Sequence, residues 1–87
     1  MADFTDPRLK RILFRSTHRG MKETDTLLGG FAAERLAGLD GGQIARFEAL
    51  LDESDTDLFD WISEKCPVPE HLDTDVMAML RAYRARL

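Results

Sequence analysis

The most restrictive feature of this sequence is the spacing of its apolar residues, which recur every three or four positions through most of the chain. Leu28, Phe31 and Ala32 show the pattern. This spacing places apolar side chains on one face of a helix. No segment alternates apolar and polar residues for long enough to predict a strand. The sequence therefore predicts an all-α fold, a compact antiparallel bundle of about five short helices.

Start and stop signals divide the chain into these helices. Asp6 followed by Pro7 predicts a helix start, because Asp accepts a free backbone N–H and proline in the first turn loses no hydrogen bond. The first helix is expected over about residues 7–17 and the second over about residues 21–36. The pair Gly29-Gly30 falls inside the second helix, where each glycine costs about 1 kcal/mol relative to alanine. The regularity of the second helix is therefore open.

Three further helices are expected downstream. Residues 40–42 (Asp-Gly-Gly) predict a turn and cap before the third, Asp55 is expected to cap the fourth, and Asp73 or Thr74 the fifth. Two prolines in residues 66–69 predict a linker before the fifth helix. The apolar faces of the three helices are formed by Ile44, Phe47 and Leu51, then by Leu58, Trp61 and Ile62, and then by Val76, Leu80, Tyr83 and Leu87.

The length of 87 residues predicts a single helical domain over residues 1–87, with residues 1–6 as a flexible N-terminus. No run approaches about 18 uninterrupted apolar residues, so no membrane span is expected. The side chains assigned to the core are Phe31, Phe47, Leu51, Trp61 and Leu80.

The single cysteine, Cys66, excludes an intramolecular disulfide and a four-cysteine zinc site, which favours a reducing compartment. Cys66 has no CxxC partner and is expected to be a buried, inert thiol. Residues 1–13 lack the continuous apolar segment of a signal peptide and the acid-poor composition of a transit peptide. We therefore expect a cytoplasmic protein of bacterial type with no targeting segment.

The net charge of −4 is unevenly distributed, with +3 over residues 1–23, −10 over residues 24–80 and +3 over residues 81–87. The acidic middle would repel a nucleic acid. A small nucleic-acid-binding module stays an alternative if the terminal helices lie side by side and combine Arg81, Arg84 and Arg86 with Arg8, Lys10, Arg11 and Arg15. A second alternative is a homo-oligomeric interaction module with Phe14 or Tyr83 on an exposed apolar patch.

The residues that carry chemistry form no site. His18 and His71 are far apart in sequence and neither has a second ligand at helical spacing, so no metal site is expected. No catalytic residue and no stably bound cofactor is predicted. A domain of this size also has little room for a water-excluding pocket, which argues against an enzyme.

The segment HRGMKETD, residues 18–25, joins the first two helices. Arg19 and Glu23 are four positions apart, so they could form a surface ion pair worth ~0.2–0.5 kcal/mol, and Gly20 could be a turn residue. Alternatively, a glycine between an arginine and an acid would let the backbone of another protein approach closely between two charged contacts.

Residues 11–32, RILFRSTHRGMKETDTLLGGFA, resemble the succinate dehydrogenase FAD assembly factors, a family of small helical proteins with an RGxxE motif between the first two helices. Arg19, Gly20 and Glu23 match the motif. The resemblance also includes Arg11, Phe14, the FEALL stretch and the DTDLFDWI stretch, and it extends over about residues 8–84.

The resemblance implies that the protein binds the flavoprotein subunit of succinate dehydrogenase, or of fumarate reductase, and promotes covalent attachment of FAD to that subunit. The FAD would belong to the partner, and neither a nucleic acid nor a membrane would be bound. The resemblance assigns Arg19 and Glu23 to charged contacts and Gly20 to the close approach. We expect the surrounding contacts to come from Arg11, His18 and Met21, with the acidic segment 52–60 left in water.

Overall fold

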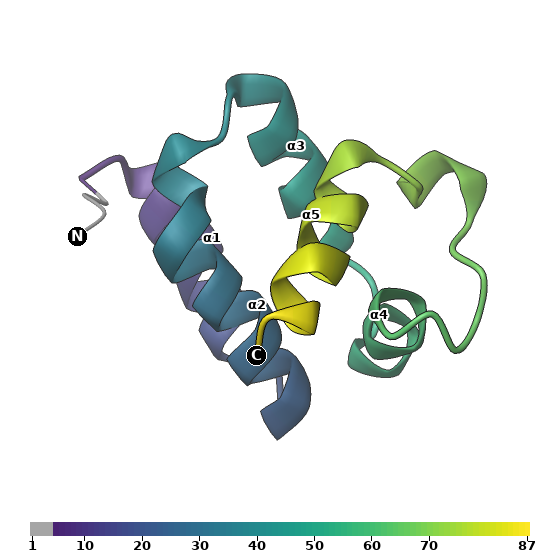
Figure 1. Cartoon of the computed structure of the whole chain (residues 1–87). Helices are drawn as coiled ribbons and strands as arrows, with labels where there is room; N and C mark the ends of the chain where they lie inside the picture. Colours follow the sequence, from purple (N-terminus) through teal and green to yellow (C-terminus); the bar gives the residue numbers. More distant parts are fainter. Residues whose placement is uncertain (1–4) are drawn as a thin grey trace.

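The computed structural model describes residues 5–87, and all regular structure in this range is helical (Figure 1). The predicted all-α fold of about five short helices is confirmed. The expected flexible N-terminus lies mostly outside the described residues, and the single domain over residues 1–87 stays a prediction. The elements are α1 (Pro7–Thr17), α2 (Lys22–Arg35), the 3-10 turn η1 (Leu36–Gly38), α3 (Gly41–Leu50), α4 (Asp55–Ile62), the 3-10 turn η2 (Glu70–Leu72) and α5 (Asp75–Ala85).

Local caps set the starts of α1 and α3. The Asp6 carboxylate accepts the Arg8 N–H at 2.8 Å and Pro7 begins α1, which therefore has the predicted bounds. Asp40 and Gln43 form a capping box, in which each side chain accepts the backbone N–H of the other residue. Because of this cap, the two glycines expected in the preceding turn are instead the first residues of α3.

The starts of α4 and α5 differ in how they are capped. The prediction that Asp55 caps α4 is wrong: Ser54 is the cap, and its Oγ accepts the Asp57 N–H at 3.2 Å. Asp55 is the first helical residue, and its carboxylate is turned toward Arg19 instead. Thr74, one of the two predicted candidates, caps α5 but makes no side-chain hydrogen bond to the helix.

The hydrophobic core is centred on Phe31. Its ring lies 5.5 Å from that of Phe47 and 5.8 Å, edge-on, from that of Tyr83, measured between centroids. Tyr83 is 9% exposed, so it forms no surface patch. The five residues assigned to the core are confirmed as buried: Phe31, Phe47, Leu51, Trp61 and Leu80.

Two expectations about burial are wrong. Leu87, expected on the apolar face of the last helix, is 70% exposed because α5 ends at Ala85. Cys66, expected to be a buried thiol, is exposed. It follows the end of α4, in a turn where the Cys66 N–H donates to the Asp60 carbonyl at 3.1 Å, and this turn carries the side chain away from the core.

Helix α2 is continuous through Gly29 and Gly30, which resolves the open question of its regularity. A Cβ atom on Gly29 would lie 2.8 Å from Thr17 Cγ2 of α1, and one on Gly30 would lie 2.5 Å from the Tyr83 hydroxyl of α5. The glycines therefore allow α1 and α5 to approach two different sides of α2 closely.

Figure 1 shows α1 and α2 side by side and antiparallel, with α5 packed against α2. It shows α4 nearly end-on, so α4 runs across these helices. The short corner between α1 and α2 faces the start of α4, as the contacts of Arg19 described below demonstrate. None of the helices in residues 5–87 is long and apolar enough to cross a membrane.

Candidate functional site

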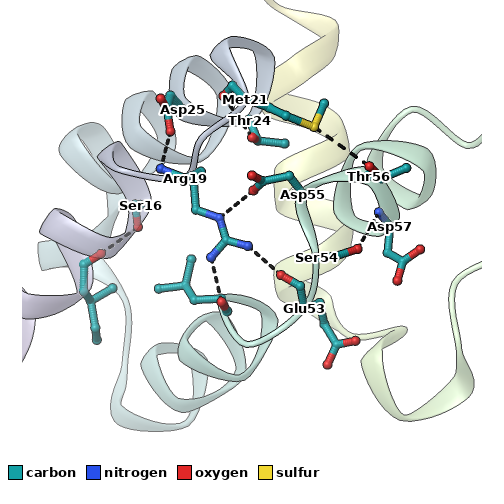
Figure 2. A network of polar contacts seen from close by, with 12 residues as sticks. Ser16, Arg19, Met21, Thr24, Asp25, Glu53, Ser54, Asp55, Thr56 and Asp57 are labelled. Carbon is teal, nitrogen blue, oxygen red and sulfur yellow. Dashed lines mark hydrogen bonds and ion pairs between the residues drawn. The ribbon is translucent and has the colours of Figure 1, made fainter.

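The corner, residues 18–25, is anchored through Arg19 (Figure 2). The Arg19 backbone N–H donates to the Asp25 carboxylate in the first turn of α2. The Arg19 guanidinium points away from α1 and donates to Asp55 Oδ1 at 2.7 Å, to the Leu51 carbonyl at 2.6 Å and to the Glu53 carbonyl at 2.5 Å. One residue therefore joins the corner to the end of α3 and the start of α4.

The interpretation that Arg19 and Glu23 form an ion pair is wrong, since Arg19 pairs with Asp55. The side chains of Arg19 and Asp55 are only 10% and 15% exposed. The expectation that all of segment 52–60 stays in water is therefore wrong at Asp55, although Asp52 and Asp57 are exposed. The physical reason is that a poorly hydrated guanidinium requires an anion within hydrogen-bonding distance.

Gly20 lies at the tip of the corner with a φ of 109°. Residues with a side chain rarely adopt this backbone conformation, so a turn role is established by geometry alone. Gly20 is also exposed, and its nearest non-neighbouring atom would lie 3.6 Å from an added Cβ. The surface above Gly20 is therefore open, and its role as a point of close approach stays a prediction.

Glu23 and Met21 lie on either side of the α2 start. Glu23 is exposed in the first turn of α2, where a negative charge is favourable, and makes no ion pair within residues 5–87. Met21 precedes the helix and is half-buried, with its Sδ 4.0 Å from Thr56 Oγ1 of α4. The Met21 side chain thus adds a second contact between the corner and α4.

Arg11 and Phe14 on the exposed side of α1, together with His18, the residue that follows the helix, are called the α1 outer face. The rings of Phe14 and His18 are stacked, with centroids 3.9 Å apart, and Phe14 is 60% exposed. His18 Nδ1 lies 2.8 Å from the Phe14 carbonyl, which can only accept, so Nδ1 carries the hydrogen. This bond fixes the ring at the C-terminal end of α1.

The structure thus leaves Gly20 and Glu23 exposed in the corner, and it directs the Arg19 side chain inward. Arg11 on α1 and His18, which follows α1, are also exposed. The sequence interpretation missed the partners of Arg19, which are Asp25, Asp55 and the two carbonyls. A usable signal was the position of Arg19 outside both helices, which removes the helical geometry that a pair with Glu23 needs.

The structure argues against one of the two alternative functions, the nucleic-acid-binding module, and leaves the other, the homo-oligomeric interaction module, open. The terminal helices lie on different sides of α2, because Gly29 faces α1 and Gly30 faces α5, so the basic face that a nucleic-acid module needs is not assembled from them. Arg8 and Arg15 also pair with Glu48 and Asp52. Of the two aromatic residues considered for an oligomer interface, only Phe14 is exposed. Within residues 5–87 no group of acids, histidines and cysteine could hold a metal ion.

Comparisons with known proteins identify similar sequences over most of the chain. A family model described as "Flavinator of succinate dehydrogenase" matches residues 10–84. "Succinate dehydrogenase assembly factor 2, mitochondrial" of Dictyostelium discoideum is 39% identical over 74 residues, which is 85% of this chain and 52% of the relative. Assembly factor 2-B of Drosophila persimilis is 36% identical over 80 residues, 90% of this chain and 51% of the relative.

These comparisons also bear on the compartment. The chain spans about half the length of the curated relatives it matches. These relatives are named as mitochondrial proteins, which overturns the expectation of a bacterial-type cytoplasmic protein with no targeting segment. That expectation rested on the composition of residues 1–13, which does not report where the relatives of this chain reside.

Proposed function

The chain belongs to the Sdh5 family of flavinators of succinate dehydrogenase, and from this premise we propose that it binds the flavoprotein subunit of succinate dehydrogenase and promotes covalent attachment of FAD to it. The same activity toward the flavoprotein of fumarate reductase is part of the proposal. The observation that carries the proposal is the match to the family over residues 10–84, which includes the whole corner.

We propose that the corner and the α1 outer face form the contact surface. Gly20 offers exposed backbone, Glu23 offers a carboxylate without an internal ion partner in residues 5–87, and Arg11 and His18 flank the exposed ring of Phe14. Interfaces commonly centre on an aromatic side chain surrounded by polar groups. The surface is thus suited to a protein partner with an apolar depression and an acidic rim facing Arg11.

In this proposal the protein is an assembly factor without a catalytic group. The flavin and the histidine to which it becomes attached belong to the partner, and this chain binds no FAD stably. Its contribution is to stabilise the conformation in which the two reacting groups are aligned. Orientation alone can lower a barrier by several kcal/mol, so no acid, base or nucleophile of the helper is required.

The test is covalent flavin on the dehydrogenase subunit, measured by in-gel fluorescence in cells that lack the native factor. The wild-type chain should restore the flavin band. Glu23→Ala should lower complex occupancy by about an order of magnitude at limiting concentration, because one charge-assisted contact is lost. Glu70→Ala, at an exposed acid in η2, is the matched control and should restore the band fully.

The proposal fails if the wild-type chain leaves the flavin content unchanged. If the chain restores flavin but Glu23→Ala equals the control, the function stands and the assignment of Glu23 to the contact surface is wrong.

The remaining alternative is a homo-oligomeric interaction module, because the exposed ring of Phe14 could also support self-association. Sedimentation of the isolated protein distinguishes this alternative from the proposed function. A concentration-dependent mass that Phe14→Ala abolishes would favour the homo-oligomeric module.

A further inference from the structure

The arginine of the corner has its hydrogen-bonding capacity directed into the protein. The Arg19 clamp is defined as Arg19 with the Asp55 carboxylate and the carbonyls of Leu51 and Glu53. Nε, Nη1 and Nη2 of Arg19 each donate to a different one of these acceptors. Figure 2 shows the guanidinium lying between them, with Asp25 holding the backbone of the same residue from the other side.

The clamp differs in its burial from the two ion pairs of α1. Arg15 and Asp52 are 37% and 70% exposed in their side chains, and Arg8 and Glu48 are 43% and 33% exposed. Exposed pairs of this kind contribute little to stability. In the clamp the exposures fall to 10% and 15%, so removal of Asp55 would leave a poorly hydrated cation with one acceptor fewer.

The clamp lies directly beneath the tip of the corner. Asp55 Oδ1 accepts from Arg19, and Oδ2 of the same carboxylate is the atom nearest to the position of a Cβ on Gly20, at 3.6 Å. The Asp55 carboxylate therefore links the backbone that precedes Gly20 directly to the first residue of α4. Motion of Asp55 would be transmitted to Gly20 through a single intervening residue.

We propose that Arg19 and Asp55 are positioning residues, which hold the corner against α4 so that Gly20 and Glu23 are presented to the flavoprotein in one geometry. Asp55 acts on binding without touching the partner. This inference rests on the proposed function, and it assigns to Arg19 an indirect role in place of a direct charged contact. It predicts that the two residues act as a unit.

The first experiment is a double-mutant cycle on binding to the purified succinate dehydrogenase flavoprotein subunit. Asp55→Asn and Arg19→Lys should each weaken binding by about tenfold, and Asp55→Ala by more than Asp55→Asn, which keeps one acceptor. The double variant Arg19→Lys/Asp55→Asn should bind the flavoprotein subunit at least as tightly as the single variant that has the lower affinity. Asp57→Asn, at an exposed acid in the same turn, is the control and should bind as the wild type does.

A direct role for Arg19 gives the opposite pattern. Asp55→Asn would then leave binding unchanged or strengthen it, because the guanidinium would be released toward the partner, and only Arg19→Lys would weaken binding. Additive losses in the double variant would also overturn the proposal. Each variant is measured at a temperature where circular dichroism shows the wild-type helical signal, so that a loss of folded protein is not counted as a loss of affinity.

A second measurement needs no partner and is therefore independent of the proposed function. In the free protein, Asp55→Asn should accelerate amide hydrogen exchange at Arg19, whose N–H donates to the Asp25 carboxylate, by about tenfold or more, while the exchange of α2 and α5 amides changes much less. Asp57→Asn should change neither. Uniform acceleration over all helices, or no change in the corner, would overturn the clamp. If the wild-type protein binds no flavoprotein, the proposed function fails while this measurement still decides the clamp.

Discussion

Gly20 has a backbone conformation that only glycine adopts without strain. Its φ of 109° costs about 1–3 kcal/mol for a residue with a Cβ, although the space around it is open. A substitution at Gly20 therefore strains the backbone of the free protein, and this effect on stability is difficult to separate from an effect on partner binding. For this reason Glu23, which is exposed on a regular helix, is the cleaner residue for tests of binding.

We predict that Gly20→Ala lowers the free energy of unfolding by about 1–3 kcal/mol. The measurement is urea denaturation followed by circular dichroism. Gly38→Ala is the matched control, since a Cβ there meets no atom within 4 Å and its φ is not positive, and it should change stability by less than about 1 kcal/mol. Equal effects at the two glycines would show that the corner relaxes to an ordinary conformation.

Among the elements, α2 depends on the absence of side chains at two adjacent positions. Gly29 and Gly30 reduce its intrinsic helix propensity, and the packing of α1 and α5 against them compensates. The 2.5 Å separation between a Cβ on Gly30 and the Tyr83 hydroxyl is shorter than the contacts that Cβ atoms make in proteins, so either Tyr83 or α2 would have to move.

We predict that Gly30→Ala destabilises the protein by about 1–3 kcal/mol despite the better helix propensity of alanine. In a Tyr83→Phe background the same change should be neutral or stabilising, since the hydroxyl is removed and the next atom, Tyr83 Cζ, lies at 3.4 Å. Thermal melts of the four proteins in this cycle provide the measurement. An equal loss of stability from Gly30→Ala in the wild-type and Tyr83→Phe proteins would show that the strain does not come from the Tyr83 hydroxyl.

The sequence predicted those parts of the fold that are determined by residues close together along the chain. The Asp6-Pro7 start of α1 is local, and α1 has its predicted bounds. The α4 cap was misassigned because Ser54 and Asp55 are both good caps, and the choice follows from the contact of Asp55 with Arg19, 36 positions away. For the site, the sequence located the corner but not the inward direction of Arg19, which the same long-range contact determines.

Elements α3 and α5 are joined by Arg46 and Asp75, whose side chains bond at 2.8 Å. The bond from Arg46, followed by one from Gln43, lowers the pKa of Asp75 below its ordinary value. A lowered pKa in the folded state means that this carboxylate contributes stability above its pKa in the unfolded chain. The contribution is lost as the pH falls through the lower, folded value.

We therefore predict that Asp75→Asn lowers stability slightly at pH 7 and that its difference from the wild type shrinks below about pH 4. The effect should be small because both side chains are well exposed. Urea denaturation of the two proteins between pH 7 and pH 3 measures the difference. A difference that grows on acidification would have the wrong sign for this ion pair.

At the scale of the whole molecule, much of the charge asymmetry is satisfied internally. Arg8, Arg15 and Arg19 on one side of the first helix and its corner pair with Glu48, Asp52 and Asp55. The basic start of the chain and its acidic middle are thus complementary parts of one fold. Lys10 and Arg11 are also exposed on α1 and form no ion pair within residues 5–87, so their charge remains at the surface.

We predict that α2 is the most slowly exchanging element in amide hydrogen exchange, because it packs against α1, α4, α5 and η1. The amides of Leu28 and Phe31 should be among the slowest, and the amide of the exposed Gly20, which donates no hydrogen bond within residues 5–87, among the fastest. Exchange followed by nuclear magnetic resonance tests the order. Slower exchange in α5 than in α2 would show that α2 is not the most stable part of the fold.

The dependence of α2 on α5 has a consequence for synthesis. The ribosome produces α5 last among the described elements, yet Tyr83 covers Gly30 and the edge of Phe31. Until α5 emerges, the nascent chain leaves apolar surface of α2 open to chaperones and proteases. The described fold is therefore completed only after α5 has been synthesised, and messages truncated before residue 75 should yield polypeptides that the cell degrades.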